Sequence, residues 1–518
     1  MPNNSSPRWA GLVLSFSVLF GAIVRFAPTI ISGSPINDGG MFYVMILNLE
    51  SNHFLIPPYS SYNQQNIPFA YPPFSFYIGG ILNSLGIPVI DLMRWLPPIV
   101  STLSIIAFYG MACLILNSKT KSTLATMAYA LMPRTFSWYV MGGGLSRTFG
   151  VVFLLLTCAS LWVLFSRNEK KYILLTAFMG AGAILNHPET GLHTAVACAL
   201  IWLFKGRSAR SLRDGLMVVL GVFVLISPWW VTVLIQHGVG PFLSAMHTGG
   251  HDPFFWIPWV TFDFAEERFV TLFMVLGLIG VVVQFLRRDW FLLIWLLIPF
   301  IVEPRSATAI AAIPLAMLAG IGLSDFILPN IENIITHTGD EKRDWTFSMV
   351  GSRAVRVVLG YVLFSALIGS FSYDISLARY VVPVNSHKAM SWIQNNTPSN
   401  GRFIVLTGSG DPFSDPITEW FPAFTSRISE NTIQGKEWLL GSDFMPFLNQ
   451  IELLQSCLND TATCVEHWAE TNRITFDYIY IDKSINPSIP SLLSFELRQD
   501  PQYTQIYENE TVVIFGRK

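Results

Sequence analysis

Charged residues are scarce in this sequence. Only 13% of the 518 residues are Asp, Glu, Lys or Arg, whereas soluble domains usually carry about 25%. A soluble protein of this length is therefore disfavoured. The net charge of −2 also argues against a protein that binds nucleic acid, because such binding depends on Lys and Arg that neutralise phosphates.

Lysine and arginine are missing from one long stretch, residues 31–93, where the only acids are Asp38, Glu50 and Asp91. Asp38 is the first acidic residue of the chain, and two glycines follow it. An apolar stretch at residues 9–30 precedes it and is long enough to cross a bilayer. Asp38 would then lie at the membrane surface. A carboxylate in that position, with no cation in its own loop, is a candidate functional residue.

Cysteine is also rare, with five residues in the chain. Cys457 and Cys464 lie in a polar C-terminal region, where they either form a disulfide that closes a small loop or remain as thiols. The other three lie in apolar segments and are expected to be packing residues: Cys113, Cys158 and Cys198.

Long apolar segments are abundant, since 52% of the residues are hydrophobic. The pattern predicts a multi-pass α-helical membrane protein with about eleven spans. The first segment has no A-x-A-like cleavage site, so we expect a retained helix rather than a signal peptide. The predicted spans lie at residues 9–30, 94–116, 122–141, 147–166, 172–187, 190–206, 215–236, 269–287, 290–303, 307–328 and 355–377.

Basic residues predict the orientation, because they gather in alternate loops. Loops rich in Lys and Arg stay in the cytoplasm, so the N-terminus is expected there and Asp38 on the opposite side. With an odd number of spans, the region after Leu377 is also extracytoplasmic. The basic residues are Lys119 and Lys121; Arg167, Lys170 and Lys171; Lys205, Arg207, Arg210 and Arg213; Arg287 and Arg288; and Lys342, Arg343, Arg353 and Arg356.

Two domains are expected: a transmembrane domain at residues 1–377 and an extracytoplasmic α/β domain at residues 378–518. Within the first external loop, residues 31–93, two amphipathic segments at 41–48 and 74–85 suit the membrane interface. In the second domain, helices are predicted at 385–396, 445–457, 464–472 and 489–497, and strands at 402–406, 476–481 and 511–515.

Four short motifs in this order resemble those of the GT-C superfamily of membrane glycosyltransferases. They are Asn37–Tyr43, Tyr71–Phe74, Gly142–Arg147 and Ala389–Pro398. The resemblance covers the whole arrangement of helices and external domain. It implies a sugar donor carried on a polyprenyl phosphate, and a carboxylate in the first external loop that acts as catalytic base or holds a metal.

The resemblance makes Asp38 the candidate general base of an inverting glycosyltransferase. The carboxylate would take the proton of an acceptor hydroxyl as its oxygen attacks the anomeric carbon. A fixed negative charge also favours the oxocarbenium-like transition state. The acceptor would be an extracytoplasmic glycan, lipid or polymer. The alternative role for Asp38 is to cap the helix that begins after it.

A cation must meet the leaving lipid phosphate, and an arginine fork suits its oxygens. The candidates are Arg147, which follows three glycines, and Arg305, each at the external end of a span. The alternatives are a snorkelling anchor for Arg147 and an ion pair with Glu303 for Arg305. Arg134 is a third candidate. Arg25 is expected to snorkel or to pair with Asp38.

Tyr71, His187 and Glu189 are the candidate residues of a substrate pocket. His187 and Glu189 share a tight external turn, and Tyr71 belongs to an aromatic motif that can stack on sugar rings. Neither His187 with His193 nor His247 with His251 matches a zinc pattern. No cofactor is predicted, and a divalent metal is not favoured because Asp38 has no second acid beside it.

The sequence lacks features that are typical of several alternative functions. It has no Trp-Trp-Asp-Tyr-Gly motif and no carboxylate at residues 139–147, so transfer of whole oligosaccharides to asparagine is disfavoured. A single-sugar transferase fits better. A secondary transporter is the alternative, although no internal repeat is visible. A catalytically inactive GT-C-like scaffold for polysaccharide assembly is another.

Overall fold

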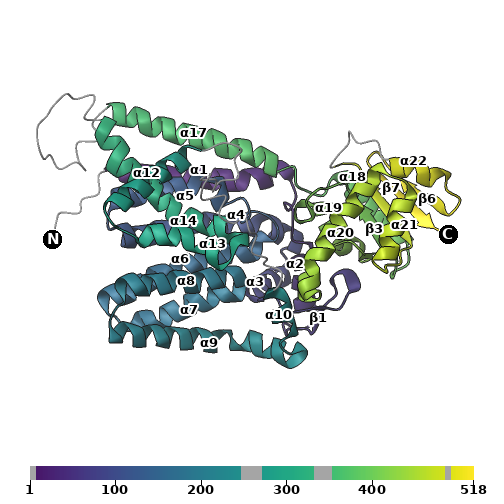
Figure 1. Ribbon diagram of the computed structural model, residues 1–518, viewed down its shortest axis with the longest axis horizontal. Coiled ribbons are helices and arrows are strands. Elements are labelled where there is room, and N and C mark those ends of the chain that lie inside the picture. Colours follow the sequence, from purple (N-terminus) through teal and green to yellow (C-terminus); the bar gives the residue numbers. More distant parts are fainter. Residues whose placement is uncertain (1–7, 247–270, 332–352, 485–491) are drawn as a thin grey trace, which may run out of the picture.

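Long helices lie side by side in a bundle, and a smaller domain with a sheet lies at one end of it (Figure 1). The computed structural model describes residues 8–246, 271–331, 353–484 and 492–518. His247, His251, Lys342 and Arg343 lie outside these ranges.

Each of the eleven predicted apolar segments contains a helix. Six of the described helices are long and apolar enough to cross a membrane, so the count of eleven spans stays a prediction. These six are α1 (Arg8–Ser32), α4 (Val89–Leu116), α6 (Gly144–Arg167), α9 (Ala209–His237), α14 (Pro304–Gly322) with its extension to Ile331, and α17 (Arg353–Leu377). The other five are α5 (Lys119–Leu131), α7 (Lys171–Asn186), α8 (Pro188–Lys205), α12 (Leu272–Leu286) and α13 (Phe291–Val302).

The predicted span at residues 122–141 is wrong in its second half. Helix α5 ends at Leu131, because Pro133 cannot continue it and holds Met132 in an extended conformation. The chain then turns through a 3₁₀ helix, Pro133–Thr135, and reaches the glycines at 142–144 as a loop. The Gly142 N–H donates to the carbonyl of Ile36 over 2.9 Å. This loop therefore lies beside the segment that carries Asp38.

The end of the bundle far from the sheet domain collects basic side chains. The Lys121 ammonium lies 2.7 Å from Asp325, and Arg287 also pairs with Asp325. Helices α5, α12 and α14 thus meet at the end where the sequence places its basic loops. Whether this end faces the cytoplasm remains a prediction.

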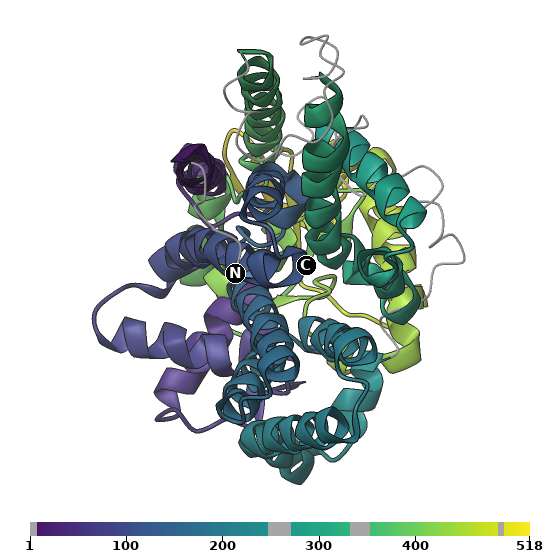
Figure 2. The same cartoon turned by 90° about the vertical axis from the view of Figure 1, so that its left-hand side faces the viewer.

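Helices α9 and α17 lie at opposite edges of the bundle in both views (Figures 1 and 2). In each of these helices, only 17% of the 18-residue apolar segment is buried. Phe223 on α9 and Phe364 on α17 are among the apolar side chains that they expose. Broad apolar faces of this kind suit contact with lipid.

The loop at residues 31–93 contains the two predicted helices, α2 (Gly40–Ser51) and α3 (Phe74–Ser84). Met45, Ile46 and Phe76 pack into one buried cluster with Trp438 of the C-terminal domain. A two-residue ribbon, β1 (Tyr59–Ser60) with β2 (Ile67–Pro68), connects the helices. The loop is therefore folded onto both domains.

The C-terminal sheet is mixed and has the order β4-β3-β5-β7-β6. Strand β3 (Arg402–Leu406) matches the predicted strand, and it pairs in parallel with β4 (Ile428–Ser429) and β5 (Tyr478–Asp482). Strand β7 (Val512–Arg517) runs antiparallel to β5 and to β6 (Tyr503–Glu508). The sequence did not predict β4 or β6.

Helices cover both faces of this sheet. Neighbouring residues of a strand point to opposite faces, so each strand contacts helices on both sides. Phe403 and Val405 pack with α18 (Val384–Asn396) and α19 (Pro416–Thr425). Ile404 and Leu406 pack against α20 (Phe444–Ser456), α21 (Ala462–Thr471) and α22 (Leu492–Gln499). The predicted α/β character is present, although helix α19 was not predicted.

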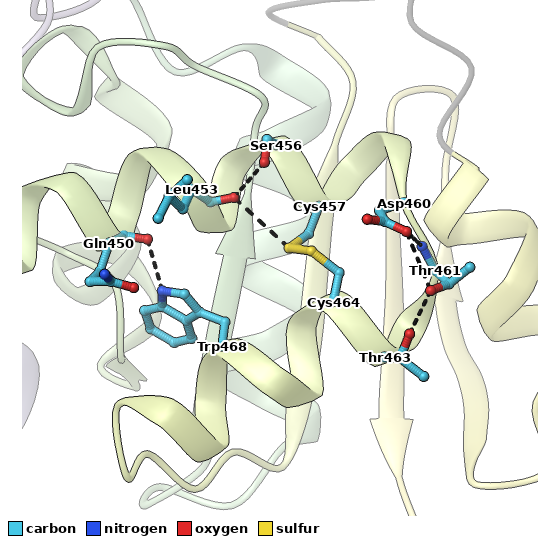
Figure 3. Close-up of a disulfide and its surroundings, with 9 residues drawn as sticks. All are labelled: Gln450, Leu453, Ser456, Cys457, Asp460, Thr461, Thr463, Cys464 and Trp468. Atoms are coloured by element: carbon cyan, nitrogen blue, oxygen red, sulfur yellow. Dashed lines mark hydrogen bonds between the residues drawn. A yellow bond between two sulfur atoms is a disulfide. The ribbon is translucent and has the colours of Figure 1, made fainter.

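Cys457 and Cys464 form a disulfide in the structure (Figure 3). Cys457 follows the end of α20 and Cys464 lies in α21, so the bond joins two consecutive helices on one face of the sheet. The indole of Trp468 donates to the carbonyl of Gln450 over 2.8 Å and holds the same two helices together.

A candidate active site where the C-terminal domain meets the membrane helices

Asp38 lies in a short loop between α1 and α2, in an unusual backbone conformation. Asn37 has φ +52° and Gly39 has φ +132°. Asparagine tolerates the left-handed region better than most residues, while the φ of Gly39 is in practice open only to glycine. The loop therefore needs neighbours that hold it in place.

Arg147 and Gly143 hold the carboxylate of Asp38. The Arg147 Nη2 lies 2.6 Å from Asp38 Oδ2, and the Gly143 N–H donates to Oδ1 over 3.0 Å. About one fifth of each charged side chain is exposed (19% for Asp38 and 21% for Arg147). The ion pair is thus partly desolvated but open to a ligand. The two residues that the sequence proposed as base and phosphate ligand are direct partners.

The glycines before Arg147 allow this contact. A Cβ atom at Gly143 would lie 2.4 Å from Asp38 Oδ2, and one at Gly142 would lie 2.2 Å from the Asp38 carbonyl oxygen. Asp38 is thus the group that approaches the backbone of these glycines.

The expectations for Arg25 were wrong. Its side chain is fully buried, with 0% exposed, so it does not snorkel, and it does not contact Asp38. Its guanidinium donates to the carbonyls of Ala130 and Tyr129 and to the Ser101 hydroxyl. These carbonyls belong to the last turn of α5, which has no further helical donors. Arg25 therefore caps α5.

The alternative role of Asp38 as a helix cap was also wrong. Gly39 is the residue that precedes α2, and the carboxylate of Glu419 accepts the N–H groups of Gly39 and Gly40, over 2.7 and 3.1 Å. Glu419 lies on α19, which sits beside α2 at the junction of the two domains (Figure 1). Sequence reasoning missed this second acid. Asp415-Pro416 is a typical helix start and could have revealed α19, but not its partner.

Tyr71 lies beside Ser146, the residue that precedes Arg147. Its hydroxyl is 3.1 Å from the Ser146 hydroxyl, and burial raises the pKa of Tyr71 above its usual value. Its ring centroid lies 6.4 Å from that of His187 and 6.2 Å from that of Trp438. The rings of Tyr71, His187 and Trp438 thus lie close together and connect the loop at residues 31–93, the turn at His187 and the C-terminal domain.

His187 begins helix α8, where its Nδ1 accepts the Thr190 N–H. Burial and, to a smaller extent, the nearby charges of Arg147 and Arg305 together lower the pKa of His187 to about 3. His187 is therefore a neutral ring at physiological pH, with the character of a hydrogen-bonding group rather than a cation.

Arg305 lies at the start of α14 and pairs with Glu189 instead of Glu303. Its Nη1 is 3.8 Å from Glu189 Oε1, and its guanidinium lies over the Phe413 ring at 5.2 Å. Glu303 accepts the backbone N–H of Arg305 and caps α14. Burial would raise the pKa of Glu303, but the nearby His193 imidazole, 3.6 Å away, and the hydrogen bonds from Ser306 lower it to about 2.

Arg134, the third cation candidate, lies in the 3₁₀ helix Pro133–Thr135. No group of three or more His, Cys, Asp or Glu side chains in the described ranges is arranged to hold a metal ion. Asp38 already receives the Arg147 guanidinium, a cation that competes with a metal for the same oxygen. These donor groups do not fit a metal site.

No protein-family model matches the sequence, and a search of curated proteins gives no match. Solved structures do match. The oligosaccharyltransferase of Archaeoglobus fulgidus, tethered with an acceptor peptide, aligns with 98% of this chain and 74% of its own, with TM-score 0.55 and 12% identity. ArnT of Cupriavidus metallidurans, bound to undecaprenyl phosphate, aligns with 98% of this chain and 97% of its own, with TM-score 0.51 and 12% identity.

The arabinofuranosyltransferase AftD from Mycobacteria is similar as well. It aligns with 99% of this chain and 42% of its own, with TM-score 0.51 and 16% identity. These likenesses cover nearly the whole chain, and they agree with the long apolar helices and the C-terminal sheet. The chain is a multi-pass membrane protein with the GT-C glycosyltransferase fold.

Proposed function

We propose that this protein is an inverting glycosyltransferase that moves a sugar from a polyprenyl-phosphate donor to an extracytoplasmic glycan, lipid or polymer. The observation that carries the proposal is the partly exposed Asp38–Arg147 pair, with 2.6 Å between its charged atoms. It places a candidate base beside a candidate phosphate ligand on a GT-C fold. Asp38 would contact the acceptor hydroxyl that attacks the sugar, and Arg147 would contact the phosphate that leaves it.

The proposed placement in the membrane follows from the charges. Residues 1–377 form the transmembrane domain, with a cytoplasmic N-terminus, and residues 378–518 form the extracytoplasmic domain. The basic side chains Lys121 and Arg287 meet at the bundle end far from Asp38, which supports this orientation under the positive-inside rule. Asp38 and the C-terminal domain share the other end, since Glu419 contacts Gly39.

Asp38 is proposed as the general base. Each of its carboxylate oxygens accepts one hydrogen bond from described residues, and each keeps a lone pair for an acceptor hydroxyl. The hydroxyl proton passes to Asp38 while the hydroxyl oxygen forms a bond to the anomeric carbon. The bond from that carbon to the phosphate oxygen breaks, and the polyprenyl phosphate leaves with its electron pair. Attack from the opposite face inverts the anomeric centre.

Arg147 is proposed to hold the leaving phosphate while it orients Asp38. Its Nε donates to the Trp138 carbonyl and its Nη2 donates to Asp38. Among the described residues, its Nη1 has no hydrogen-bond partner. A phosphate oxygen can take that position. Arg305, whose side chain is 47% exposed, is proposed as a second cation for the same phosphate.

Tyr71, His187 and Glu189 are proposed to line the sugar pocket. The neutral imidazole, the protonated phenol and the carboxylate together offer donors and acceptors for sugar hydroxyls. Trp438 beside Tyr71 adds an aromatic face. The polar groups would orient the sugar, and the rings would cover its apolar face.

The test is a panel of undecaprenyl-phosphate-linked mannose, glucose, galactose and arabinofuranose, incubated with purified protein and a membrane glycan extract. We expect one of them to release undecaprenyl phosphate and transfer its sugar. Asp38→Asn, which keeps the shape of the side chain, should reduce transfer at least about a hundredfold. Full activity of Asp38→Asn would refute the role as base.

A catalytically inactive scaffold is the second candidate, because an Asp38 whose only role is to pair with Arg147 would also look like this. In that case neither the wild-type protein nor Asp38→Asn consumes any donor of the panel. A secondary transporter would instead move labelled solute into liposomes. Uptake without donor consumption would replace the proposal by transport.

A further inference from the structure

A second carboxylate, that of Glu419, reaches the Asp38 loop from the C-terminal domain. Its side chain is 4% exposed. One oxygen accepts the N–H groups of Gly39 and Gly40, and the other accepts the amide of Gln434 over 3.0 Å. Within the described ranges, the hydrogen bonds to this carboxylate come from the Asp38 loop or from its own domain. It is not available to a substrate.

Helix α19 contacts the same loop through its backbone and through Trp420. The Trp420 indole donates to the Asn37 carbonyl over 2.8 Å, and the Tyr62 hydroxyl donates to the Glu419 carbonyl over 2.6 Å. A Cβ atom at Gly40 would lie 2.7 Å from that carbonyl oxygen. The loop from Asn37 to Gly40 is thus held from the C-terminal side of the site at three residues, Asn37, Gly39 and Gly40.

The loop needs this support because its backbone is strained at two positions, Asn37 and Gly39, on either side of Asp38. Arg147 and Gly143 fix only the Asp38 side chain and carbonyl from the membrane side. Glu419 fixes the peptide groups that follow. One of its oxygens also faces the first N–H groups of α2, a position that the helix dipole makes favourable for a carboxyl group.

We propose that Glu419 is a positioning residue for Asp38, through which the C-terminal domain sets the direction of the carboxylate in the sugar-transfer reaction. This inference rests on the proposed function of Asp38. It predicts that the C-terminal domain is required for turnover and not only for recognition of the acceptor. A shift of about 1 Å in a reacting group can change a rate about a hundredfold.

The experiment compares three variants of the full chain. Glu419→Ala removes the acceptor oxygens, Glu419→Gln keeps one that can accept both N–H groups, and Glu430→Gln is the matched control. Glu430 is also in the C-terminal domain and 3% exposed, and it pairs with Arg402. It makes no recorded contact with residues 37–40. The readouts are kcat and KM on the undecaprenyl-phosphate sugar panel, and amide hydrogen exchange of residues 37–45.

We expect Glu419→Ala to lower kcat at least about tenfold with KM within about twofold, and to speed the exchange of Gly39 and Gly40 by a similar factor. Glu419→Gln should restore both to within about threefold of wild type, and Glu430→Gln should change neither. A loss of kcat that Glu419→Gln does not rescue, or that Glu430→Gln shares, would show general destabilisation and overturn the proposal.

Failure of this inference is distinct from failure of the proposed function. If Asp38→Asn abolishes transfer but Glu419→Ala keeps wild-type kcat and exchange, Asp38 stays the base and Glu419 has no positioning role. If Asp38→Asn transfers at the wild-type rate, the base assignment fails and the positioning role fails with it.

Discussion

Arg147 donates from Nη2 to Asp38 Oδ2 over 2.6 Å, so one ion pair joins the candidate base to the candidate phosphate ligand. Each side chain is about four-fifths buried. Such a pair is stabilised by short charge-assisted contacts but weakened by the loss of water around both ions. The arrangement makes each residue depend on the other for its position.

Replacement of Arg147 should therefore affect both chemistry and stability. Arg147→Ala leaves the Asp38 charge without its partner, so we expect a loss of about 2 kcal/mol in the free energy of unfolding and at least about a hundredfold in kcat. Arg147→Lys keeps the charge but not the fork, so it should restore stability more than donor affinity. Thermal unfolding in detergent measures the stability, sugar transfer measures kcat, and binding of undecaprenyl phosphate measures the affinity for the donor phosphate.

The control for Arg147 is Arg210→Ala, because Arg210 is an exposed arginine at the far end of the bundle. It should leave both readouts unchanged. Wild-type binding of undecaprenyl phosphate by Arg147→Ala would remove Arg147 from the phosphate site.

Gly143→Ala should disable the site through a single methyl group. The added Cβ would lie 2.4 Å from Asp38 Oδ2, well inside van der Waals contact, so the carboxylate must leave Arg147. We expect kcat to fall at least about tenfold. Gly110→Ala is the matched control, since nothing lies within 4 Å of a Cβ there. Equal kcat for Gly143→Ala and wild type would mean that Asp38 works from another position.

Local sequence patterns predicted the individual elements well. The strand at 402–406 matches β3, and the segments at 41–48 and 74–85 fall within or close to α2 and α3. These elements have strong apolar patterns with Pro or Gly at their ends, which are local signals. The prediction of a helix through residue 141 was wrong, because it followed the hydropathy of the segment and did not take Pro133 into account.

Contacts between distant residues could not be predicted in the same way. Gly39 and Glu419 are 380 positions apart, and nothing in either segment indicates the other. Asp38 therefore looked like a lone acid, and Arg25 looked like its nearest cation. The structure replaces Arg25 by Arg147 because the loop before α6 lies beside the loop that follows α1, with Gly142 and Gly143 donating to Ile36 and Asp38. Only the tertiary arrangement determines such partners.

His187 should make the protein acid-sensitive. Its pKa is about 6.5 when unfolded and about 3 in the folded protein, so below pH 6.5 the unfolded state binds a proton that the folded state does not. Its contribution is complete above pH 6.5 and declines as the pH falls towards 3. Between pH 7 and pH 4.5 we expect a loss of roughly 2 kcal/mol from this residue.

His187→Asn tests that expectation, because asparagine also caps a helix but does not titrate in this range. The variant should lose less thermal stability than wild type between pH 7 and pH 4.5. His467→Asn, at an exposed position, should follow the wild-type curve. Identical acid sensitivity of wild type and His187→Asn would show that another group is responsible.

Arg305 offers a separation of binding from stability. Its side chain is 47% exposed and its pair with Glu189 spans 3.8 Å, so the pair should contribute less than about 1 kcal/mol to stability. Arg305→Ala should keep the wild-type melting temperature but raise the donor KM about tenfold, with kcat less affected. Glu189→Gln keeps Arg305 and should give a smaller increase. An unchanged donor KM in Arg305→Ala would leave Arg147 as the sole candidate for the phosphate.

The disulfide should stabilise the C-terminal domain without a role in turnover. Closing a loop between cysteines separated by 7 positions restricts the unfolded chain by roughly 2–3 kcal/mol. Cys464→Ala, Cys457→Ala and the double variant should all lose about this amount, because each breaks the same bond, and a reductant should bring wild type to the same level. The bond joins α20 to α21, on the face of the sheet opposite α19. We therefore expect kcat of Cys464→Ala to equal that of wild type at temperatures where both are folded, and a lower kcat there would mean that the α20–α21 face also supports the Asp38 loop.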